Sequence, residues 1–593
     1  MLLLFNYSSV AGTNELIANN LSFQYKLNDR EYFFENEIAF FFLISNANIK
    51  DELESIFSKD TLSIELIKSS LKGDYFGVFI EKLTSEIIVI RDKSGINTGY
   101  YRHDETNRKL VISSLMHEIT QFSSCNFDDE AVYQFLYSDY LWDGQTFYKE
   151  VNEFKIGGEY FFDKNLQLLR EEKFEIVFDN KENDLSEQQN ISVLREKIVE
   201  AHKKYINKEN VVLLSGGIDS VAIIIALDDL IKKDRIKAHS YKVKNAINAD
   251  ETVYAKSIAN HLDIDIDVFE TELRQNTSSL EFEKLILKMN NPYMGVHIFN
   301  DNFENVDKIT YYAGQDTRLH TPSVNKVDLL AFNLINKPKI ILKSLNGLMY
   351  ILRPLFKLFE GSRNRKLRGL LRVTYIFNLK KYVYKYYFKI DKMHLKSQDL
   401  PLEFFDKFKS NYQLDLSKIN TARGLYNEIV ALKWREQYVS DIRYLQDMAR
   451  MNNSYIALPF YDMEIAKYKA GIPFNLAIKT MLGKAEFGEA KKIVYKYLLR
   501  MSLKDKIDDK TFYRSKAAPA TFYVLFNEGL SNTIKSVFTS DLNSEKPFIK
   551  KYKLDRFINK FMEKSLPWKE EDQGYLLKIY NTAAMICYYN RLI

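Results

Sequence analysis

Cysteine is scarce in this sequence, and its scarcity excludes two kinds of site. The chain of 593 residues has two cysteines, Cys125 and Cys587, which lie far apart and outside any CxxC spacing. A disulfide framework or a zinc-ribbon site needs several cysteines at short spacings. We therefore expect neither of them, and we expect a reduced, cytoplasmic protein.

Charge of one sign and long apolar runs are also lacking. The formal net charge is +5, with 84 Lys and Arg against 79 Asp and Glu, which does not favour nucleic acid as a partner. The apolar stretch at 340–356 is interrupted by Lys343, Asn346 and Arg353, whereas a spanning helix needs about 20 mostly apolar residues. The N-terminal run MLLLF is short and has no basic region, so it predicts a buried first strand rather than a signal peptide. We expect no integral membrane segment.

Aromatic residues, in contrast, are abundant. The sequence has 39 Tyr and 41 Phe, and 46% of its residues are hydrophobic. This composition favours well-buried cores over disorder. The chain is too long for one ordinary core, and domain sizes allow roughly two to four domains.

The pattern of apolar residues changes along the chain. Before residue 160, short apolar runs bounded by Gly and charge predict antiparallel strands joined by hairpins, at 74–80, 86–90 and 111–114. Residues 178–190 are acidic and polar, which is typical of a linker. Beyond them strand-like and helical spacings alternate, which predicts a parallel sheet with helical crossovers. The expected elements are a helix at 191–206, a strand at 210–214, a helix at 221–230, a strand at 237–243 and a helix at 250–261.

The segment Ser215-Gly216-Gly217-Ile218-Asp219-Ser220 lies between a predicted strand and a predicted helix. Backbone N–H groups at the start of a helix have no partner within the helix, so a phosphate binds there readily. Two glycines let the backbone approach an anion without an intervening Cβ. The serine hydroxyls add donors, and Asp219 is suited to hold a magnesium ion that bridges phosphate oxygens. The segment therefore predicts a phosphate site; the alternative is a Gly-Gly turn that only caps a helix.

This loop resembles the signature of ATP-pyrophosphatases, which cleave ATP to AMP and pyrophosphate while adenylating a substrate. It is not a Walker loop, because no GxxxxGK[ST] segment occurs. Further segments follow the order of the asparagine synthetase family, which joins an N-terminal glutaminase domain to a C-terminal synthetase domain. These segments are GDYFG at 73–77, RDKSG at 91–95 with Tyr100-Tyr101, TFYKEV at 146–151 with Gly157-Gly158, Asp250-Glu251, PFYD at 459–462, KYLLR at 496–500, and Arg514 with Lys516 and Pro519.

The resemblance implies an α/β protein of two parts. Residues 1–177 would form a degenerate glutaminase-like domain, an αββα sandwich of the Ntn-hydrolase type, and residues 178–190 a linker. Residues 191–593 would form an ATP-pyrophosphatase domain of the adenine nucleotide alpha hydrolase type, with a parallel sheet and a large helical extension. Within it, residues 325–391 are basic and apolar together and would form a helical insertion.

Departures from the family pattern change the expected activity. The family's glutaminase uses an N-terminal Cys as its nucleophile, whereas here Met1 is followed by Leu2, so we expect no glutamine hydrolysis. The loop after the next strand has Gly314 and Asp316, but Thr317 stands where the family has Glu. With these departures the chain is most similar to lasso-peptide cyclases and β-lactam synthetase-type members, which keep the ATP half and use an amine other than ammonia.

The resemblance also implies roles for individual residues. Asp219 and Asp316 would bind magnesium. Lys496 would stabilise the negative charge that develops on the acyl-adenylate and pyrophosphate; the alternative is a solvated lysine on a helix. Leu214 and Val243, at neighbouring strand ends, would flank the adenosine. The residues expected to bind ATP are Leu214, Ser215, Gly216, Gly217, Asp219, Ser220, Val243, Gly314 and Asp316.

Two further features have alternatives that the sequence leaves open. Asp462 is either a functional residue of the PFYD segment or a helix N-cap, since Asp before an apolar-periodic run is a common start signal. The basic segment 339–372 would bind a peptide, an acidic substrate or a membrane surface, or it is an amphipathic helical pair with solvated Lys and Arg.

The leading hypothesis is an ATP- and magnesium-dependent amide synthetase that adenylates a small-molecule or peptide carboxylate and transfers the acyl group to an amine. A precursor peptide or another partner from a biosynthetic cluster would fit this hypothesis. One alternative uses ammonia, as an asparagine synthetase or a sugar-carboxylate amidotransferase. Another, from a different class, is a nucleotide-binding pseudoenzyme that serves as a scaffold.

Overall fold

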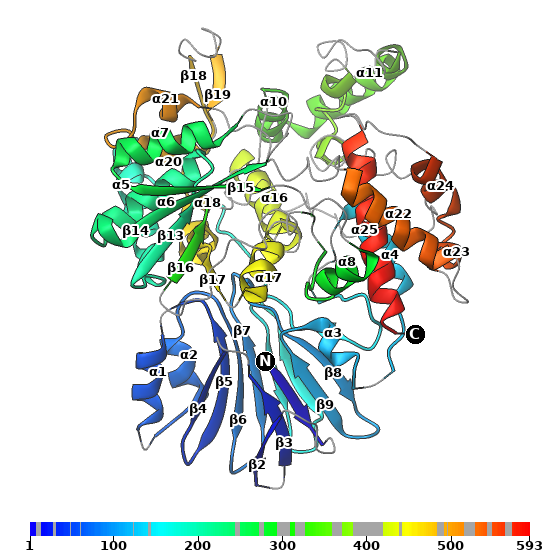
Figure 1. Ribbon diagram of the computed structural model, residues 1–593. Helices are drawn as coiled ribbons and strands as arrows, with labels where there is room; N and C mark the ends of the chain where they lie inside the picture. The colour runs from blue at the N-terminus through cyan, green and yellow to red at the C-terminus, as the bar shows by residue number, and fades with distance from the viewer. Residues whose placement is uncertain are drawn as a thin grey trace.

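The structure is a computed structural model with side chains. It describes residues 1–593 with the exception of 7–12, 20, 28–30, 48, 60, 123, 140, 142–143, 244–249, 272–277, 293, 295–308, 315–325, 359–370, 384–418, 438–441, 453, 483–490, 495, 515–527, 543–547, 564–571 and 593. It is a mixed α/β protein in which two antiparallel sheets come first and a parallel sheet follows (Figure 1).

The first part of the chain forms two six-stranded antiparallel sheets, which lie at the bottom of Figure 1. One has the order β10-β8-β9-β1-β3-β2 and the other the order β12-β11-β7-β6-β5-β4. The predicted strands and hairpins before residue 160 are confirmed. The strands are β1 (Leu2–Phe5), β2 (Asn14–Ala18), β3 (Leu21–Lys26), β4 (Glu31–Glu35), β5 (Ala39–Ser45), β6 (Tyr75–Glu81), β7 (Ile87–Arg91), β8 (Tyr100–Asp104), β9 (Lys109–Ser113), β10 (Asn152–Glu153), β11 (Glu159–Phe162) and β12 (Leu168–Glu172).

Aromatic side chains fill the space between these two sheets. Phe23 contacts Phe5 with ring centroids 5.3 Å apart, and it meets Phe40 of the other sheet edge to face at 5.6 Å. All four residues of β1 are buried, which confirms the predicted first strand. Because side chains alternate along a strand, Leu3 and Phe5 enter this inner core, whereas Leu2 and Leu4 belong to a cluster on the outer face.

Helices cover the outer face of each antiparallel sheet. The helices α1 (Lys50–Phe57) and α2 (Ile64–Ser70) share a cluster with Phe41 of β5. The helices α3 (Met116–Ile119) and α4 (Asp129–Ser138) share a cluster with Val111 of β9. The resulting order of layers is helix, sheet, sheet, helix.

A parallel sheet follows, with the order β15-β14-β13-β16-β17. Its strands are nearly continuous apolar runs because both faces are covered. Val212 and Tyr312 enter the cluster that contains α5 and α6, and Val211 and Tyr311 enter the cluster on the opposite face. The elements are α5 (Glu187–Lys203), β13 (Glu209–Leu213), α6 (Ile218–Asp228), β14 (Ile236–Val243), α7 (Thr252–Leu262), β15 (Asp265–Thr271), α8 (Ser279–Ile286), β16 (Ile309–Ala313) and β17 (Tyr455–Ala457).

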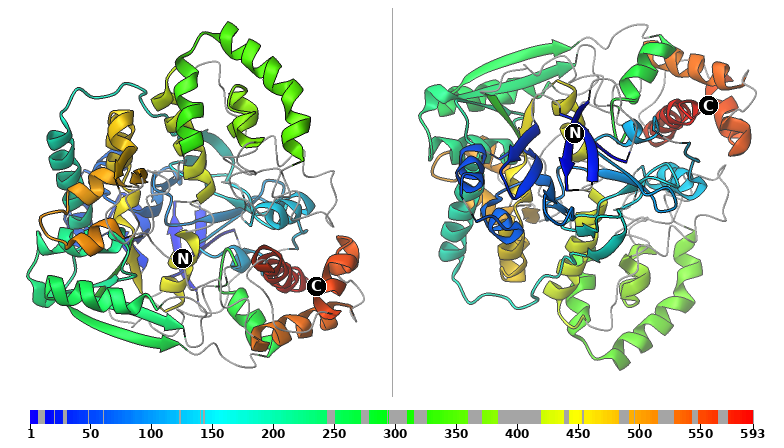
Figure 2. Two further views of the ribbon diagram at one scale, coloured as in Figure 1. Left: turned by 90° about the horizontal axis from the view of Figure 1, so that it is seen from above. Right: turned by 90° about the horizontal axis from the view of Figure 1, so that it is seen from below.

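The rest of the described chain is mainly helical, as predicted, and Figure 2 shows these helices arranged around the sheets. A short hairpin, β18 (Lys479–Leu482) and β19 (Lys491–Val494), is the exception. None of the described helices has the length and apolarity needed to cross a bilayer. The helices are α10 (Lys326–Asn333), α11 (Lys339–Lys357), α13 (Leu379–Tyr382), α16 (Ala422–Gln437), α17 (Arg443–Met451), α18 (Met463–Ala470), α19 (Phe474–Ala477), α20 (Tyr497–Met501), α21 (Asp509–Tyr513), α22 (Glu528–Leu542), α23 (Phe548–Lys551), α24 (Asp555–Glu563) and α25 (Gln573–Asn590), with short 3-10 turns at Lys233–Arg235, Leu334–Asn336 and Pro459–Tyr461.

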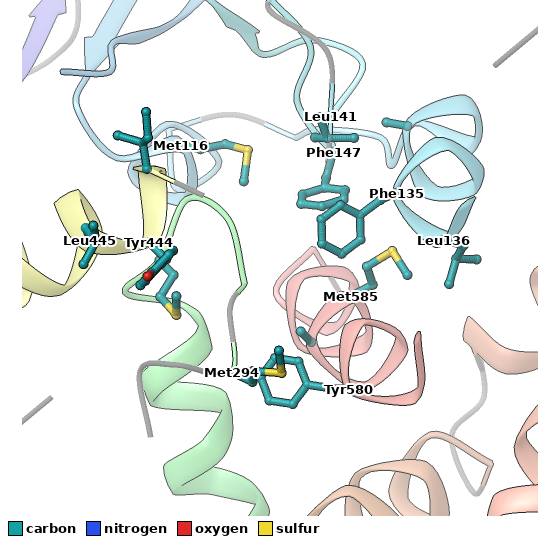
Figure 3. Close-up of a cluster of buried hydrophobic side chains, with 14 of the residues drawn as sticks. Met116, Phe135, Leu136, Leu141, Phe147, Met294, Tyr444, Leu445, Tyr580 and Met585 are labelled. Atoms are coloured by element: carbon teal, nitrogen blue, oxygen red, sulfur yellow. The ribbon is translucent and has the colours of Figure 1, made fainter. Parts of the chain in front are cut away.

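The last helix, α25, packs on the first part of the chain. Phe147 stacks on Tyr588 with ring centroids 5.3 Å apart and meets Phe135 of α4 edge to face at 5.1 Å. Figure 3 shows Phe135 and Phe147 on the side of the cluster that faces Met585 of α25. The two ends of the sequence therefore share one core. The division into domains at 177 and 191 stays a prediction.

A buried pair of carboxyl groups joins the first sheets to α5. Asp74 and Asp92 are 2% and 3% exposed. The Tyr205 hydroxyl, just beyond α5, donates to Asp74 Oδ1 at 2.9 Å, and the Ser94 hydroxyl donates to both carboxyl groups. Burial, with the neighbouring Asp92 carboxyl, raises the pKa of Asp74 to about 8, and burial also raises the pKa of Asp92.

Candidate functional site

The predicted phosphate site at residues 215–220, called the phosphate loop below, lies at the carboxyl end of β13, the central strand of the parallel sheet. The backbone N–H of Leu214 donates to the carbonyl of His239 at 2.8 Å, which carries the sheet pairing one residue past the strand. Gly216 then adopts a φ of 67°, a left-handed conformation that favours glycine. This turn brings the chain into α6 at Ile218, with Gly217 as the N-cap.

The start of α6 has free hydrogen-bonding capacity. Among the described residues, no side chain caps Gly217. The backbone N–H of Val221 donates to the Gly217 carbonyl at 3.2 Å, and the N–H groups before it have no acceptor within a helix. The Ser220 hydroxyl donates to the same carbonyl at 2.9 Å. The buried, apolar body of α6 therefore presents its positive end at the edge of the sheet.

Asp219, in the first turn of α6, forms an ion pair with Lys496. One oxygen, Asp219 Oδ2, accepts from the lysine, whereas Oδ1 is buried without a hydrogen-bond partner among the described residues. The Lys496 side chain is 18% exposed, so Lys496 is not a solvated surface lysine. Lys496 has a φ of 58° and is the N-cap of α20, a left-handed conformation that is rare and costly outside glycine.

Arg514 is a second cation at the loop that the sequence interpretation did not include among the site residues. Its guanidinium donates to the Gly216 carbonyl at 2.6 Å, lies 3.4 Å from Glu251 and stacks 3.8 Å above the ring of Tyr254. Arg500 donates to the backbone carbonyl of Arg514 at 2.9 Å and thereby fixes this segment. The signal was present in the sequence, because Arg500, Glu251 and Arg514 all belong to the segments that carry the family resemblance.

Gly314 follows β16 and lies against the start of α6. A Cβ at this position would be 2.7 Å from the backbone nitrogen of Ser220 and 2.9 Å from Cβ of Asp219. Because these neighbours are backbone or close to it, they cannot move aside easily. The structure thus brings Gly314 next to the phosphate loop, and it does so through direct packing of two neighbouring strand ends.

The other predicted site residues have different surroundings. Asp316 lies outside the described residues. The side chain of Leu214 is 2% exposed and belongs to the apolar cluster around α6. Val243 ends β14, but the register pairs Leu213 with His239, so Val243 lies about 13 Å beyond the end of β13 along its own strand. An adenosine site between Leu214 and Val243 stays a prediction.

Asp462 caps a helix. Its Oδ1 accepts from the backbone N–H of Glu464 at 2.8 Å and from that of Ile465 at 3.4 Å, at the start of α18. Its other oxygen forms an ion pair with Lys204. The N-cap alternative is therefore confirmed, and the described contacts of Asp462 are structural.

No group of three or more His, Cys, Asp or Glu within the described ranges has a geometry that would hold a metal ion. This does not conflict with a magnesium site at Asp219, because magnesium often uses one or two protein carboxylates and takes its other ligands from phosphate and water. The unpartnered, buried Oδ1 of Asp219 is a suitable ligand atom. The residues present therefore fit a magnesium ion that arrives with a phosphate ligand.

Comparisons with known proteins find a family likeness for one segment of the chain. Residues 194–295, which contain the phosphate loop, match the family model described as asparagine synthase. No curated protein matches the chain.

Two solved structures share limited similarity with the chain. They are the glutamine phosphoribosylpyrophosphate amidotransferase from B. subtilis complexed with ADP and GMP, and a structure described as the allosteric regulatory enzyme of purine biosynthesis. Each is 11% identical to this chain with a TM-score of 0.17, and they cover 50% and 42% of it. The chain spans 62% and 63% of their lengths. Similarity at this level defines neither fold nor function. The comparisons therefore support a likeness of residues 194–295 to asparagine synthase.

Proposed function

We propose that this protein is an ATP-dependent amide synthetase that adenylates a carboxylate and releases AMP and pyrophosphate. The family is one of ATP-dependent ligases, which supports the general class. The observation that carries the proposal is the set of contacts at the start of α6. There an uncapped helix end meets Lys496 and Arg514, which come from a distant part of the sequence.

The loop is suited to hold the β- and γ-phosphates of ATP. The N–H groups of Gly217, Ile218 and Asp219 point along the positive end of α6, and Gly216 and Gly314 leave the approach free of Cβ atoms. Asp219 Oδ1 would be a magnesium ligand, and a bound magnesium ion would neutralise charge on the phosphate oxygens.

In the first chemical step, an oxygen of the substrate carboxylate attacks the α-phosphorus of ATP, and the bond between this phosphorus and the pyrophosphate oxygen breaks. Negative charge grows on the leaving pyrophosphate. The ammonium group of Lys496 and the guanidinium of Arg514, both beside the loop, would stabilise that charge where it develops. Lys496 must then exchange part of its contact with Asp219 for contact with phosphate.

In the second step, the nitrogen of an amine attacks the acyl carbon, the bond to the AMP oxygen breaks, and the amine loses a proton to solvent. The amine would come from a substrate rather than from glutamine, as in lasso-peptide cyclases and related natural-product amide synthetases. Supporting this, burial raises the thiol pKa of both Cys125 and Cys587, and a protonated thiol is a poor nucleophile. Residues 1–177, with their helix-sheet-sheet-helix layers, would be an Ntn-type glutaminase shell without that activity.

Exchange of labelled pyrophosphate into ATP tests the proposal. We expect exchange that depends on a carboxylic acid from a panel that includes aspartate and the peptides encoded near the gene. Asp219→Asn should reduce it at least about a hundredfold, because it removes a phosphate-site charge. Asp229→Asn, at the opposite end of α6, is the matched control and should retain exchange.

An Asp219→Asn protein that exchanges pyrophosphate as fast as the wild type would contradict the proposal. If no acid supports exchange although ATP binds, the protein is a nucleotide-binding scaffold. Mass spectrometry of products formed with ammonium or with a substrate amine then identifies the acceptor.

A further inference from the structure

Helix α11 (Lys339–Lys357) exposes a row of large apolar side chains. Ile340, Ile351 and Leu358 are 78%, 74% and 78% exposed. Single exposed apolar residues are common on proteins, but a contiguous patch indicates an interaction site. The exposed apolar residues on and directly after this helix are Ile340, Ile341, Leu348, Tyr350, Ile351, Leu355 and Leu358.

Helical geometry places most of these residues on one face. Successive residues of a helix are rotated by about 100° around its axis. All the exposed apolar residues named above except Tyr350 therefore fall within a stripe about 100° wide. Leu342 and Met349, which lie on the opposite side of the helix, are partly buried. The helix is therefore attached to the protein along one side and presents its apolar stripe to the outside. We call the six residues of this stripe the α11 stripe: Ile340, Ile341, Leu348, Ile351, Leu355 and Leu358.

Positive charge flanks the α11 stripe. Lys343 and Lys357 are exposed and project on one side of the stripe by the same helical geometry, as does Tyr350. From residue 329 to residue 359 the sequence has five Lys or Arg and no Asp or Glu. Arg353 is buried, and it donates to the carbonyl of Thr374 at 3.1 Å, which anchors the helix.

The apolar stripe and the positive charge beside it fit some kinds of partner better than others. The helix does not meet the requirements for crossing a bilayer. A second copy would bring two stripes with the same positive flank together, which charge repulsion opposes. An apolar stripe with a lysine flank is, in contrast, complementary to a bilayer surface with anionic headgroups, where apolar side chains enter the acyl boundary and lysines pair with phosphates.

We infer that α11 is an interfacial helix that docks this protein on an anionic lipid surface through the α11 stripe, with Lys343 and Lys357 directed to the headgroups. In Figures 1 and 2, α11 projects at the periphery of the molecule, on the side away from the antiparallel sheets. Docking there leaves those sheets exposed to solvent. The inference does not depend on the proposed adenylation, because it uses neither the phosphate loop nor any residue near it.

Co-sedimentation of the full chain with vesicles tests the inference. We expect binding to vesicles of equimolar phosphatidylcholine and phosphatidylglycerol, little binding to phosphatidylcholine alone, and weaker binding as salt is raised. Ile351→Glu should weaken binding at least about tenfold because it places a charge in the acyl boundary. Lys343→Glu combined with Lys357→Glu should also weaken binding about tenfold or more.

Matched controls come from the opposite side of the molecule. Leu83→Glu changes a side chain that is 80% exposed in the turn between β6 and β7, and Lys50→Glu with Lys59→Glu reverses two exposed charges at α1. Both should bind vesicles as the wild type does. All substituted positions in this set are exposed, so unchanged melting temperatures are expected throughout.

Two outcomes would overturn the inference. One is a wild-type protein that stays in the supernatant with both kinds of vesicle, and the other is an Ile351→Glu protein that sediments as the wild type does. If the wild type ignores vesicles but forms a dimer that Ile351→Glu dissociates in sedimentation velocity, the α11 stripe is instead an interface between two copies. Since pyrophosphate exchange in solution needs no vesicles, failure here leaves the proposed function untouched.

Discussion

Asp74 and Asp219 are both buried aspartates, and each has one carboxyl oxygen without a hydrogen-bond partner among the described residues. Their surroundings nevertheless differ. Asp74 is enclosed by Asp92 and the hydroxyl groups of Ser94 and Tyr205. Asp219 lies at the positive end of α6 and is paired with Lys496.

The difference lies in what compensates each carboxyl group. Burial, with the neighbouring Asp92 carboxyl, raises the pKa of Asp74 to about 8, so a neutral, protonated acid joins the first sheets to Tyr205 near neutral pH. For Asp219, the compensating charge is the ammonium group of Lys496, whose side chain is 18% exposed. Burial alone therefore does not distinguish the two carboxyl groups, whereas the cation paired with Asp219 does.

Among the predicted effects on activity and stability, the largest is expected when Lys496 is removed from Asp219. Lys496→Met should lower pyrophosphate exchange by about two to three orders of magnitude, because a cation aimed at developing charge contributes on that scale. It should also destabilise the fold, since Asp219 becomes a buried charge without its partner. Steady-state exchange and thermal melting measure the two effects separately.

The double variant Asp219→Asn with Lys496→Met is the informative control. It should recover the melting temperature without recovering exchange. Lys506→Met removes an ion pair with Asp229 at 2.5 Å. It should lower pyrophosphate exchange and the melting temperature much less than Lys496→Met does. A double variant that regains activity would mean that Lys496 only neutralises Asp219.

The pH dependence of stability should separate the two aspartates next. The pKa of Asp74 is raised from its ordinary value of 3.8 to about 8, so the folded state holds this proton more tightly than the unfolded state. Stability therefore falls as pH rises between about 4 and about 8, by up to about 1.4 kcal/mol per pH unit. Asp74→Asn, which resembles the protonated acid, should flatten this slope.

Thermal melts at pH 5 and pH 8 measure the effect. Asp74→Asn should gain stability relative to the wild type at pH 8 and little at pH 5. The control is Asp104→Asn, whose carboxyl lies at the surface and has a lowered pKa through hydrogen bonds from Asn107. Parallel curves for the wild type and Asp74→Asn would show that Asp74 is ionised like an ordinary surface acid.

Adding a methyl group next to Asp219 should affect stability and ATP binding less than removing Lys496 affects activity. Gly314→Ala adds a Cβ that would lie 2.7 Å from the backbone nitrogen of Ser220, so α6 and β16 must separate slightly. We expect a loss of about 1–3 kcal/mol in stability and an ATP affinity lowered about tenfold, measured by calorimetry. Gly471→Ala is the control, because its nearest neighbours would be 3.6 Å away.

The smallest predicted effect is at Tyr205. Tyr205→Phe removes the hydrogen bond to Asp74 and should cost about 1 kcal/mol, and more above pH 8, where the acceptor becomes charged. Tyr468→Phe removes a hydrogen bond of the same length, 2.9 Å, to the neutral side chain of Asn190. The stability lost in Tyr468→Phe should not vary with pH. Pyrophosphate exchange should be unchanged in both variants.

The sequence predicted the elements around the loop well, because strand, glycine turn and apolar helix are local patterns. The predicted strand at 210–214 and helix at 221–230 correspond to Glu209–Leu213 and Ile218–Asp228. The largest shift is in α5, which begins at Glu187 rather than at 191, because Ser186 and Gln189 form a capping box inside the polar stretch. Tyr455–Ala457, with three residues, is too short for its alternation to be recognised.

The contacts that complete the candidate site could not be predicted from local patterns. The approach of Arg514 to Gly216 and the left-handed backbone of Lys496 depend on how distant segments pack. The order of family segments drew attention to both residues but says nothing of distances. For Asp462, both alternatives had the same local signal, and its backbone contacts decided for the N-cap.

Asp219 and Lys496 are separated by 277 positions in the chain, and Gly216 and Arg514 by 298. During synthesis, the phosphate loop thus leaves the ribosome long before either cation exists. A chain that ends after the parallel sheet would have the loop but neither Lys496 nor Arg514. Asp219 therefore gains its ion pair with Lys496 only after the segment that contains Lys496 and Arg514 has been made and has packed against the loop.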